Sequence, residues 1–333
     1  MTIERIGIIG GGAWGTALGH LVAKAGRQSL LWARNPEIVA SINQNHENTA
    51  YLKDIPLDRG LKASTDLAEI CRSDAILLVV PAQVVRIMLE TMAAINTASV
   101  PVICCAKGLE IGSGLTMSEV AAESLPAHPI GCLSGPTFAA EAIRGAPTAA
   151  TLAIADTALG AEIALAIGSL TFRPYVSSDV IGAEIGGAVK NVLAIACGVA
   201  VGLGFGENTR AALITRGLAE ATRLAVALGG RAETLSGLAG LGDLTMSCGS
   251  RQSRNFRFGE ALGQGMPVET ILAHMGGVVE GRHTAEATAQ RVAALDIEMP
   301  ICHAVDAVLN HGVELRATID GLLSRPLRAE RDG

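Results

Sequence analysis

Aromatic side chains are scarce in this sequence, with only two Trp, two Tyr and five Phe among 333 residues. Basic residues are too few to balance the acidic ones, and the formal net charge is -6. No basic run with interleaved aromatics occurs, so the sequence argues against nucleic-acid binding, which needs positive surface and stacking rings. An anionic ligand must therefore be bound by cations placed locally.

Cysteine is present, but its spacing excludes the usual frameworks. The seven cysteines are an odd number, Cys104 and Cys105 are adjacent, and no pair has C-x-x-C spacing. We therefore expect reduced, buried thiols rather than disulfides or a zinc site. No cluster of His, Cys and carboxylate residues has the spacing of metal ligands, and His283 near Glu280 comes nearest to one. The sequence predicts no metal.

Long apolar runs are also missing. The mean hydropathy of +0.39 comes from Ala and Gly, and the longest charge-free run, 124–140, contains three prolines. A membrane-spanning helix needs roughly 18 apolar residues, and we expect no segment to supply them and no membrane insertion. The chain starts directly with a strand pattern, without a cleavable signal, so we expect a cytoplasmic protein.

Length and periodicity predict two domains. A chain of 333 residues with 49% hydrophobic residues is long and apolar enough to form two hydrophobic cores. Strand and helix signals alternate as far as residue 180, which predicts an α/β doubly wound parallel sheet over 1–180. Helices joined by glycine loops follow, which predicts an all-helical domain over 181–333. The expected strands are 5–9, 29–33, 75–80, 102–106, 130–133, 148–155 and 171–176.

A glycine-rich loop follows the first predicted strand. Residues 10–15 read Gly-Gly-Gly-Ala-Trp-Gly, a G-x-G-x-x-G pattern that opens a helix. In this context Gly10 permits a tight turn, Gly12 lets backbone N–H groups approach a pyrophosphate, and Gly15 lets the helix pack on the strand. The motif predicts a Rossmann-type dinucleotide-binding domain.

The residues after the second strand indicate which dinucleotide is preferred. In this fold an acidic residue at that point bonds the 2′-hydroxyl of the NAD ribose. This chain has Arg34 and Asn35 instead. Because a guanidinium pairs well with a phosphate, Arg34 favours the 2′-phosphate of NADP without excluding NAD.

Lys190 lies in surroundings that make a free ammonium group costly. Its neighbours are apolar residues, Gly and Ala, and no Asp or Glu occurs between Glu184 and Glu207. Such a lysine either extends its ammonium to water or is buried with a lowered pKa. In the second case it serves as an acid or base near neutral pH, which makes Lys190 the candidate catalytic residue.

Three other places offer polar groups to a ligand. Lys107 follows strand 102–106, at the sheet edge where ligands bind, although a solvated loop lysine is the alternative. Segment 134–138, Ser-Gly-Pro-Thr-Phe, offers N–H groups and a hydroxyl at a helix start. Asp243 is a lone carboxylate among glycines and apolar residues, with a helix N-cap as the alternative.

Two later segments complete the candidates. Residues 250–257, Ser-Arg-Gln-Ser-Arg-Asn-Phe-Arg, concentrate cations and amides. They suit a phosphate because arginine offers a planar fork, and a solvated basic helix end is the alternative. Residues 278–282, Val-Val-Glu-Gly-Arg, form a glycine-flanked polar turn whose role the spacing leaves open.

Together these motifs resemble those of the bacterial-type NAD(P)-dependent glycerol-3-phosphate dehydrogenases over nearly the whole chain. The matching segments are 10–15, Ala106-Lys107-Gly108-Leu109-Glu110, Ser134-Gly135-Pro136-Thr137-Phe138-Ala139, Gly187-Ala188-Val189-Lys190-Asn191-Val192, Gly240-Leu241-Gly242-Asp243-Leu244 and Gln252-Ser253-Arg254-Asn255. The resemblance implies reversible hydride transfer between NAD(P)H and dihydroxyacetone phosphate. The product is then sn-glycerol 3-phosphate for glycerophospholipid synthesis, and we expect a homodimer.

The resemblance also implies the site residues. Around the substrate it places Lys107, Gly135, Thr137, Lys190, Asp243, Ser253, Arg254 and Asn255. Around the dinucleotide it places Gly10, Gly12, Ala13, Trp14, Gly15, Arg34, Lys107, Ala139, Arg254, Val278 and Glu280. Ala13 departs from the small hydroxyl residue often found there, which removes one side-chain contact to a phosphate and leaves the backbone N–H groups.

Two other functions stay open at this point. One is a hydroxyacid or sugar-acid dehydrogenase of the same two-domain build, which gives no reason for the cluster Ser253-Arg254-Asn255. The other is a non-catalytic dinucleotide sensor, which needs the glycine loop but not Lys107, Lys190 and Asp243 together. NADPH oxidation with a panel of substrates distinguishes them.

Overall fold

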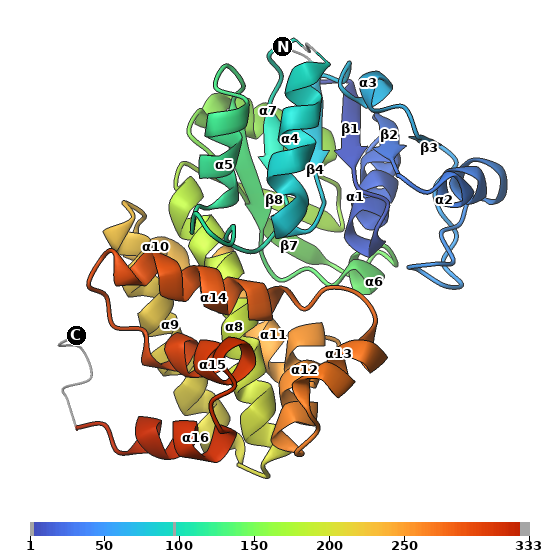
Figure 1. Cartoon of the computed structure of the whole chain (residues 1–333). Helices are drawn as coiled ribbons and strands as arrows, with labels where there is room; N and C mark the ends of the chain where they lie inside the picture. The colour runs from blue at the N-terminus through green and yellow to red at the C-terminus, as the bar shows by residue number, and fades with distance from the viewer. Residues whose placement is uncertain (1–2, 96–97, 327–333) are drawn as a thin grey trace.

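The computed structural model describes residues 3–95 and 98–326. A sheet with helices on both faces forms one half, and a group of helices forms the other (Figure 1). Within these residues, eight strands lie in the order β3-β2-β1-β4-β5-β6-β7-β8. They are β1 Arg5–Ile9, β2 Gln28–Trp32, β3 Leu61–Ser64, β4 Ala75–Leu78, β5 Val102–Cys104, β6 Ile130–Ser134, β7 Thr148–Ile154 and β8 Phe172–Ser177.

The central strands are buried on both faces, as their continuous apolar sequences predict. Ile8 of β1 contributes to a core on one face, where it packs with Leu18 and Leu21 of α1 and Ile163 of α7. Ile9 contributes to the core on the other face, under α4 and α5. The helices of this half are α1 Ala13–Lys24, α2 Pro36–Ala40, α3 Leu67–Ile70, α4 Val85–Ala94, α5 Met117–Ser124, α6 Ala139–Ala142 and α7 Thr157–Ile167, with short turns η1 Ser41–Asn45 and η2 Ala82–Val84.

The expectation of a wholly parallel sheet is wrong at one pair of strands. β6 and β7 are antiparallel, with Gly131 opposite Ile154, whereas β7 and β8 are parallel again. The only helix in the connection between β6 and β7 is α6, whose four residues span about 6 Å. A crossover connection would have to return along the length of β6, which is about 17 Å. The chain therefore does not cross back along the sheet, and β7 starts from the edge where β6 ends.

The described part of the second half contains helices and no strand, as the sequence predicts. Its elements are α8 Val180–Gly202, α9 Glu207–Ala227, α10 Ala232–Leu235, η3 Leu238–Gly242, α11 Asp243–Gly249, α12 Arg254–Gly263, α13 Val268–Met275, α14 Glu280–Ala293, α15 Pro300–His311 and α16 Leu315–Leu323. Helix α8 lies at the centre of this half, among α9, α11, α12 and α14 (Figure 1). The Asp179 side chain caps its start by accepting from the Gly182 N–H at 2.9 Å.

Two glycines let α8 and α12 cross with their backbones in contact. A Cβ added to Gly198 would lie 2.1 Å from the Phe256 carbonyl oxygen, and one added to Gly259 would lie 2.0 Å from the Ile195 carbonyl oxygen. Any larger side chain at either position would separate the helices. This crossing holds α12 against the C-terminal half of α8.

Helix α8 corrects one expectation from the sequence. Its 23 residues and a mean hydropathy of 1.7 over its most apolar window make it long and apolar enough to span a membrane. The helix contains two charged residues, Glu184 and Lys190, but they do not lower the mean hydropathy below that of a possible membrane-spanning helix. In the fold, 83% of the window is buried inside the protein, so the helix forms the core of the helical half.

Candidate functional site

The predicted site residues gather where the carboxyl ends of the strands meet the helical half. Lys107 follows β5 and Gly135 follows β6, while Lys190 lies in the middle of α8 and Asp243 opens α11. Because parallel strands end at one edge of a sheet, β5 and β6 deliver their following residues to the same place. The helical half covers that edge and brings Lys190 and Asp243 to it.

Two lysines share one buried carboxylate at this edge. Lys107 Nζ lies 2.5 Å from Oδ2 of Asp243, and Lys190 Nζ lies 3.1 Å from Oδ1. The Asp243 side chain is fully buried, and the two lysine side chains are 16% and 11% exposed. Lys107 also donates to the Gly135 carbonyl at 2.8 Å. Lys190 is therefore held inside the protein, and Asp243 pairs with cations instead of capping a helix.

Burial and charge act on both members of the pair Lys190–Asp243. Burial lowers the pKa of Lys190, the Asp243 carboxylate opposes that change, and the ammonium of Lys107 lowers it further. Burial raises the pKa of Asp243, but the two neighbouring ammonium groups outweigh it and hold that pKa below its usual value. Lys190 thus gives up its proton more readily than a free lysine, next to a carboxylate that stays ionised.

Sequence reasoning missed Ser247 as a member of this cluster. Lys190 Nζ donates to the Ser247 hydroxyl at 2.8 Å, and that hydroxyl donates to Oδ1 of Asp243 at 3.3 Å. Ser247 is four residues after Asp243 on α11, so both side chains lie on the same face of the helix. That spacing is the signal in the sequence that could have identified it.

Buried amides connect the cluster to the later helices. The Asn191 side chain donates to the Lys107 carbonyl at 2.9 Å and accepts from the Asn255 amide at 2.9 Å. Asn255 accepts in turn from the Gly281 N–H at 3.1 Å. The side chain of Asn255, predicted to bind substrate, thus links α8, α12 and α14. Its neighbour Ser253 caps α12 by accepting from the Phe256 N–H at 3.3 Å.

Arg254, Val278 and Glu280 lie together on the other side of the site. The Arg254 guanidinium donates to the Val278 carbonyl at 3.0 Å. Glu280 accepts from the Ala82 N–H at 3.3 Å with one oxygen, and its other oxygen is buried without a partner in the described part of the chain. Burial raises the pKa of this carboxyl group. Glu280 therefore contacts η2, which follows β4.

The glycine loop leaves room for a phosphate at the start of α1. Gly10 has φ +130°, and a Cβ on Gly15 would lie 1.9 Å from the Gly10 carbonyl oxygen, so the loop packs tightly there. A Cβ on Gly12, by contrast, meets no described atom within 4 Å. The first N–H groups of a helix have no partner within it, so an open loop at this helix start suits a pyrophosphate.

The remaining predicted dinucleotide residues lie around this loop. The Trp14 ring packs edge-on against Phe172 at 6.3 Å between ring centroids. Arg34 follows β2 and is exposed. Ala139 opens α6, and Thr137 donates to the Gly135 carbonyl at 3.2 Å.

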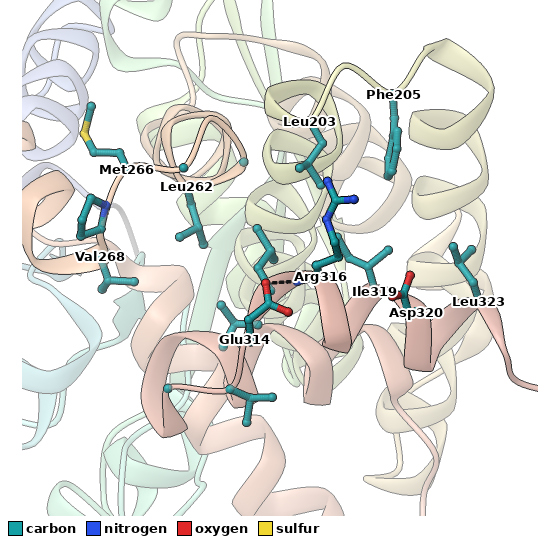
Figure 2. A pocket seen from close by; sticks show the side chains of 17 residues that line it. Leu203, Phe205, Leu262, Met266, Val268, Glu314, Arg316, Ile319, Asp320 and Leu323 are labelled. Carbon is teal, nitrogen blue, oxygen red and sulfur yellow. Dashed lines mark hydrogen bonds between the residues drawn. The ribbon is translucent and has the colours of Figure 1, made fainter.

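A separate pocket lies in the helical half, away from these residues. It has a volume of about 540 Å³, and its lining includes Leu203, Phe205, Leu262, Arg316 and Ile319. Figure 2 shows these side chains between α16 and the neighbouring helices. None of the predicted site residues lines it.

The fold and the site together define a dinucleotide-dependent oxidoreductase of two halves. Its glycine loop suits a nicotinamide dinucleotide, and its buried lysines offer a proton donor at the same edge of the sheet.

Comparison with known proteins identifies the family. The models for the N-terminus and the C-terminus of NAD-dependent glycerol-3-phosphate dehydrogenase match residues 5–160 and 179–320. The chain therefore belongs to this family, as its motifs predict, and its cofactor is NAD or NADP.

Individual relatives match along the whole chain. A glycerol-3-phosphate dehydrogenase (NAD(P)+) from Rhodospirillum rubrum is 56% identical over 98% of this chain and 94% of the relative. One from Caulobacter vibrioides is 54% identical over 99% of this chain and 100% of the relative. The crystal structure of glycerol-3-phosphate dehydrogenase from Coxiella burnetii superposes with a TM-score of 0.92 at 36% identity, covering 98% of this chain and 100% of that one.

Proposed function

We propose that this protein interconverts dihydroxyacetone phosphate and sn-glycerol 3-phosphate with NADPH or NADH, that it prefers NADPH, and that it supplies glycerophospholipid synthesis. The observation that carries the proposal is the buried cluster of Lys190, Asp243 and Lys107 at the sheet edge next to the glycine loop. A sensor has no need to bury two cations on one carboxylate, because burying charge is costly.

Lys190 is the catalytic acid and base. The bound nicotinamide supplies the hydride during reduction and accepts it during oxidation. Lys190 donates a proton to the carbonyl oxygen of the substrate in the first direction and removes the hydroxyl proton in the second. Asp243 and Ser247 hold the Lys190 ammonium in place. Lys107 adds positive charge where the oxygen becomes negative.

The substrate phosphate binds at the start of α12. Ser253 ends the preceding turn, and Arg254 is the first residue of the helix. The helix start favours an anion, and the Arg254 fork gives it a bidentate partner. Asn255, Thr137 and Gly135 complete the substrate contacts.

The dinucleotide binds across the carboxyl edge of the sheet. Its pyrophosphate lies on the loop formed by Gly10, Gly12, Ala13, Trp14 and Gly15. Arg34 pairs with the 2′-phosphate of NADP, which gives the preference for NADPH. The nicotinamide end is enclosed by Lys107, Ala139, Arg254, Val278 and Glu280.

We extend the proposal to the whole protein. Residues 1–180 hold the dinucleotide, residues 181–333 hold the substrate, and the chain acts in the cytoplasm as a homodimer without inserting into a membrane. The burial of α8 in the core supports the last point, since its apolar surface is already covered.

The test measures NADPH oxidation with dihydroxyacetone phosphate, dihydroxyacetone and a set of 2-keto acids. We expect turnover with the first and very little with the others, because the phosphate aligns the carbonyl. Turnover with a 2-keto acid alone would favour the hydroxyacid dehydrogenase, and binding of NADPH with no turnover would favour the sensor.

An Arg254→Lys variant locates the phosphate. It keeps the charge and loses the planar fork, so kcat/KM for dihydroxyacetone phosphate should fall by on the order of 10- to 100-fold. The slow reaction of dihydroxyacetone should hardly change, because that substrate never used the contact. Equal losses for both substrates would mean that Arg254 supports the cofactor or the fold instead.

A further inference from the structure

A buried asparagine outside the predicted site contacts the glycine loop. Asn48 is 1% exposed and lies between η1 and β3. Its side-chain amide donates to the Gly11 carbonyl oxygen at 3.0 Å and to the Thr16 hydroxyl at 2.8 Å. Its Oδ1 is buried and bonds to nothing in the described ranges. Asn48 therefore contacts the loop and α1 through its N–H groups alone.

The bond to Gly11 decides where the next N–H group points. The peptide joining Gly11 and Gly12 is trans, so its C=O and N–H point in opposite directions. Asn48 holds the Gly11 carbonyl toward the protein, which directs the Gly12 N–H to the other side. The loop is open around Gly12, since a Cβ built on that residue would meet no described atom within 4 Å, and α1 starts at the next residue, Ala13.

The sequence of the loop restrains this peptide only weakly. Residues 10–12 are three consecutive glycines, and glycine allows a peptide plane to rotate at little steric cost. Backbone bonds restrain the flanks, where the Gly10 N–H donates to Trp32 at 3.0 Å and the Thr16 N–H donates to Gly12 at 2.9 Å. Neither of these bonds restrains the Gly11 carbonyl, so the restraint on that group comes from Asn48.

The segment that carries Asn48 is anchored without this side chain. Ile42, Leu52 and Leu57 of the segment are buried in the core of the sheet. Asn43 makes two bonds to the backbone of Ala63 in β3, both of 2.9 Å. Removing the Asn48 amide should therefore leave the segment folded, and its main effect should be on the loop.

We propose that Asn48 is a positioning residue for the dinucleotide: it fixes the Gly11–Gly12 peptide so that the Gly12 N–H donates to the pyrophosphate. This inference rests on the proposed function only in taking a nicotinamide dinucleotide as the ligand of the loop.

The test compares Asn48→Leu, which keeps the size and removes the donor, with the unmodified protein. Titration calorimetry without substrate should show NADPH bound about tenfold more weakly, the loss expected for one hydrogen bond to a charged group. At saturating NADPH, kcat should stay within about twofold, because Asn48 touches no reacting atom. Adenosine 2′-phosphate, which lacks the pyrophosphate, should inhibit both proteins equally.

The matched control is Asn43→Leu, which removes the same side-chain type and two hydrogen bonds from the same segment. It should lower the melting temperature and leave the NADPH dissociation constant unchanged. If Asn48→Leu fails to fold, Asn48→Ala also lacks the donor, adds no charge and should likewise bind NADPH more weakly. Wild-type affinity in a folded Asn48 variant, or an equal loss in Asn43→Leu, would overturn the inference. Failure of the unmodified protein to oxidise NADPH would instead overturn the proposed function.

Discussion

At the scale of single residues, the site depends on an uneven balance of charge. One carboxylate, Asp243, serves two ammonium groups, so the buried cluster keeps an excess of positive charge. Removing Asp243 would leave the ammonium groups of Lys107 and Lys190 buried without a partner. The loss of stability would then exceed the net contribution of the ion pairs. Removing one lysine leaves a paired ion, so lysine variants are the cleaner probes of catalysis.

Lys190→Ala should abolish proton transfer while the protein stays folded. We expect kcat to fall by about 100-fold or more, with the NADPH dissociation constant nearly unchanged because the glycine loop is intact. Steady-state kinetics and a binding titration measure the two quantities. A variant that keeps more than about a tenth of the wild-type kcat would exclude Lys190 as the proton donor.

Arg34→Asp tests the preference for NADPH. Replacing a cation by an anion beside the 2′-phosphate changes attraction into repulsion, so the KM for NADPH should rise far more than the KM for NADH. Arg34→Gln, which only removes the charge, should give a smaller change in the same direction. If both cofactors respond equally, the 2′-phosphate is bound elsewhere.

At the scale of elements, α8 joins the two halves through a second buried acid. Glu184 is 6% exposed and accepts from the N–H and the hydroxyl of Ser118 at 2.8 and 2.5 Å, at the start of α5. Burial raises the pKa of Glu184 to about 7, although the bonds from Ser118 oppose that change. The contact between α8 and α5 therefore changes its charge near neutral pH.

Glu184→Gln should remove a pH dependence of stability. Between the usual glutamate value and about 7, the folded protein binds the Glu184 proton more than the unfolded chain does. The free energy of unfolding therefore falls as pH rises through this window. At pH 8 the Gln variant should be more stable than wild type, by on the order of 1 to 3 kcal/mol. At low pH the difference should vanish.

Urea denaturation at several pH values measures this effect. The matched control is Glu123→Gln, a change at an exposed glutamate of α5. Its free energy of unfolding should depend on pH in the same way as that of wild type. If the free energies of unfolding of Glu184→Gln and wild type change with pH in the same way, Glu184 is ionised over the whole pH range.

The elements were predictable where local sequence determines them. Seven strands were expected close to their observed positions. Most of them contain a run of apolar residues bounded by Gly, Pro or polar residues, whereas β8 contains Arg173 and Pro174. β3 was missed because four residues, Leu-Lys-Ala-Ser, give no pattern by themselves and pair only because β2 lies beside them. The reversal of β7 was missed because strand direction depends on the path of the connection.

The sequence singled out the charged residues of the candidate site more readily than the residues that support them. Lys107, Lys190 and Asp243 stand out because charge is rare among apolar residues, and the structure brings all three together. Asn48 gives no such signal, because its role comes from a contact 37 residues away in sequence with Gly11. Such a contact depends on the tertiary fold.

At the scale of the whole molecule, several polar contacts join the two halves. Besides the lysine cluster, Arg291 pairs with Glu119 at 2.7 Å, and the Gly112 N–H donates to Gln290 at 3.0 Å. We expect one denaturation transition for the described halves.

NADPH at about 100 times its dissociation constant should raise the free energy of unfolding by about 2.7 kcal/mol. The whole transition should move, because both halves unfold as one unit. Two transitions, with only the first moved by NADPH, would show that the halves unfold separately.

The burial of α8 has a consequence for the newly made chain. The ribosome completes this apolar helix at Gly202, whereas α12, which crosses it in backbone contact, ends only at Gly263. At typical rates of synthesis, about 3 to 12 seconds pass between the two. During that interval a helix apolar enough to enter a membrane has no complete cover. We therefore expect the helical half to be the part of the nascent protein most in need of protection by chaperones.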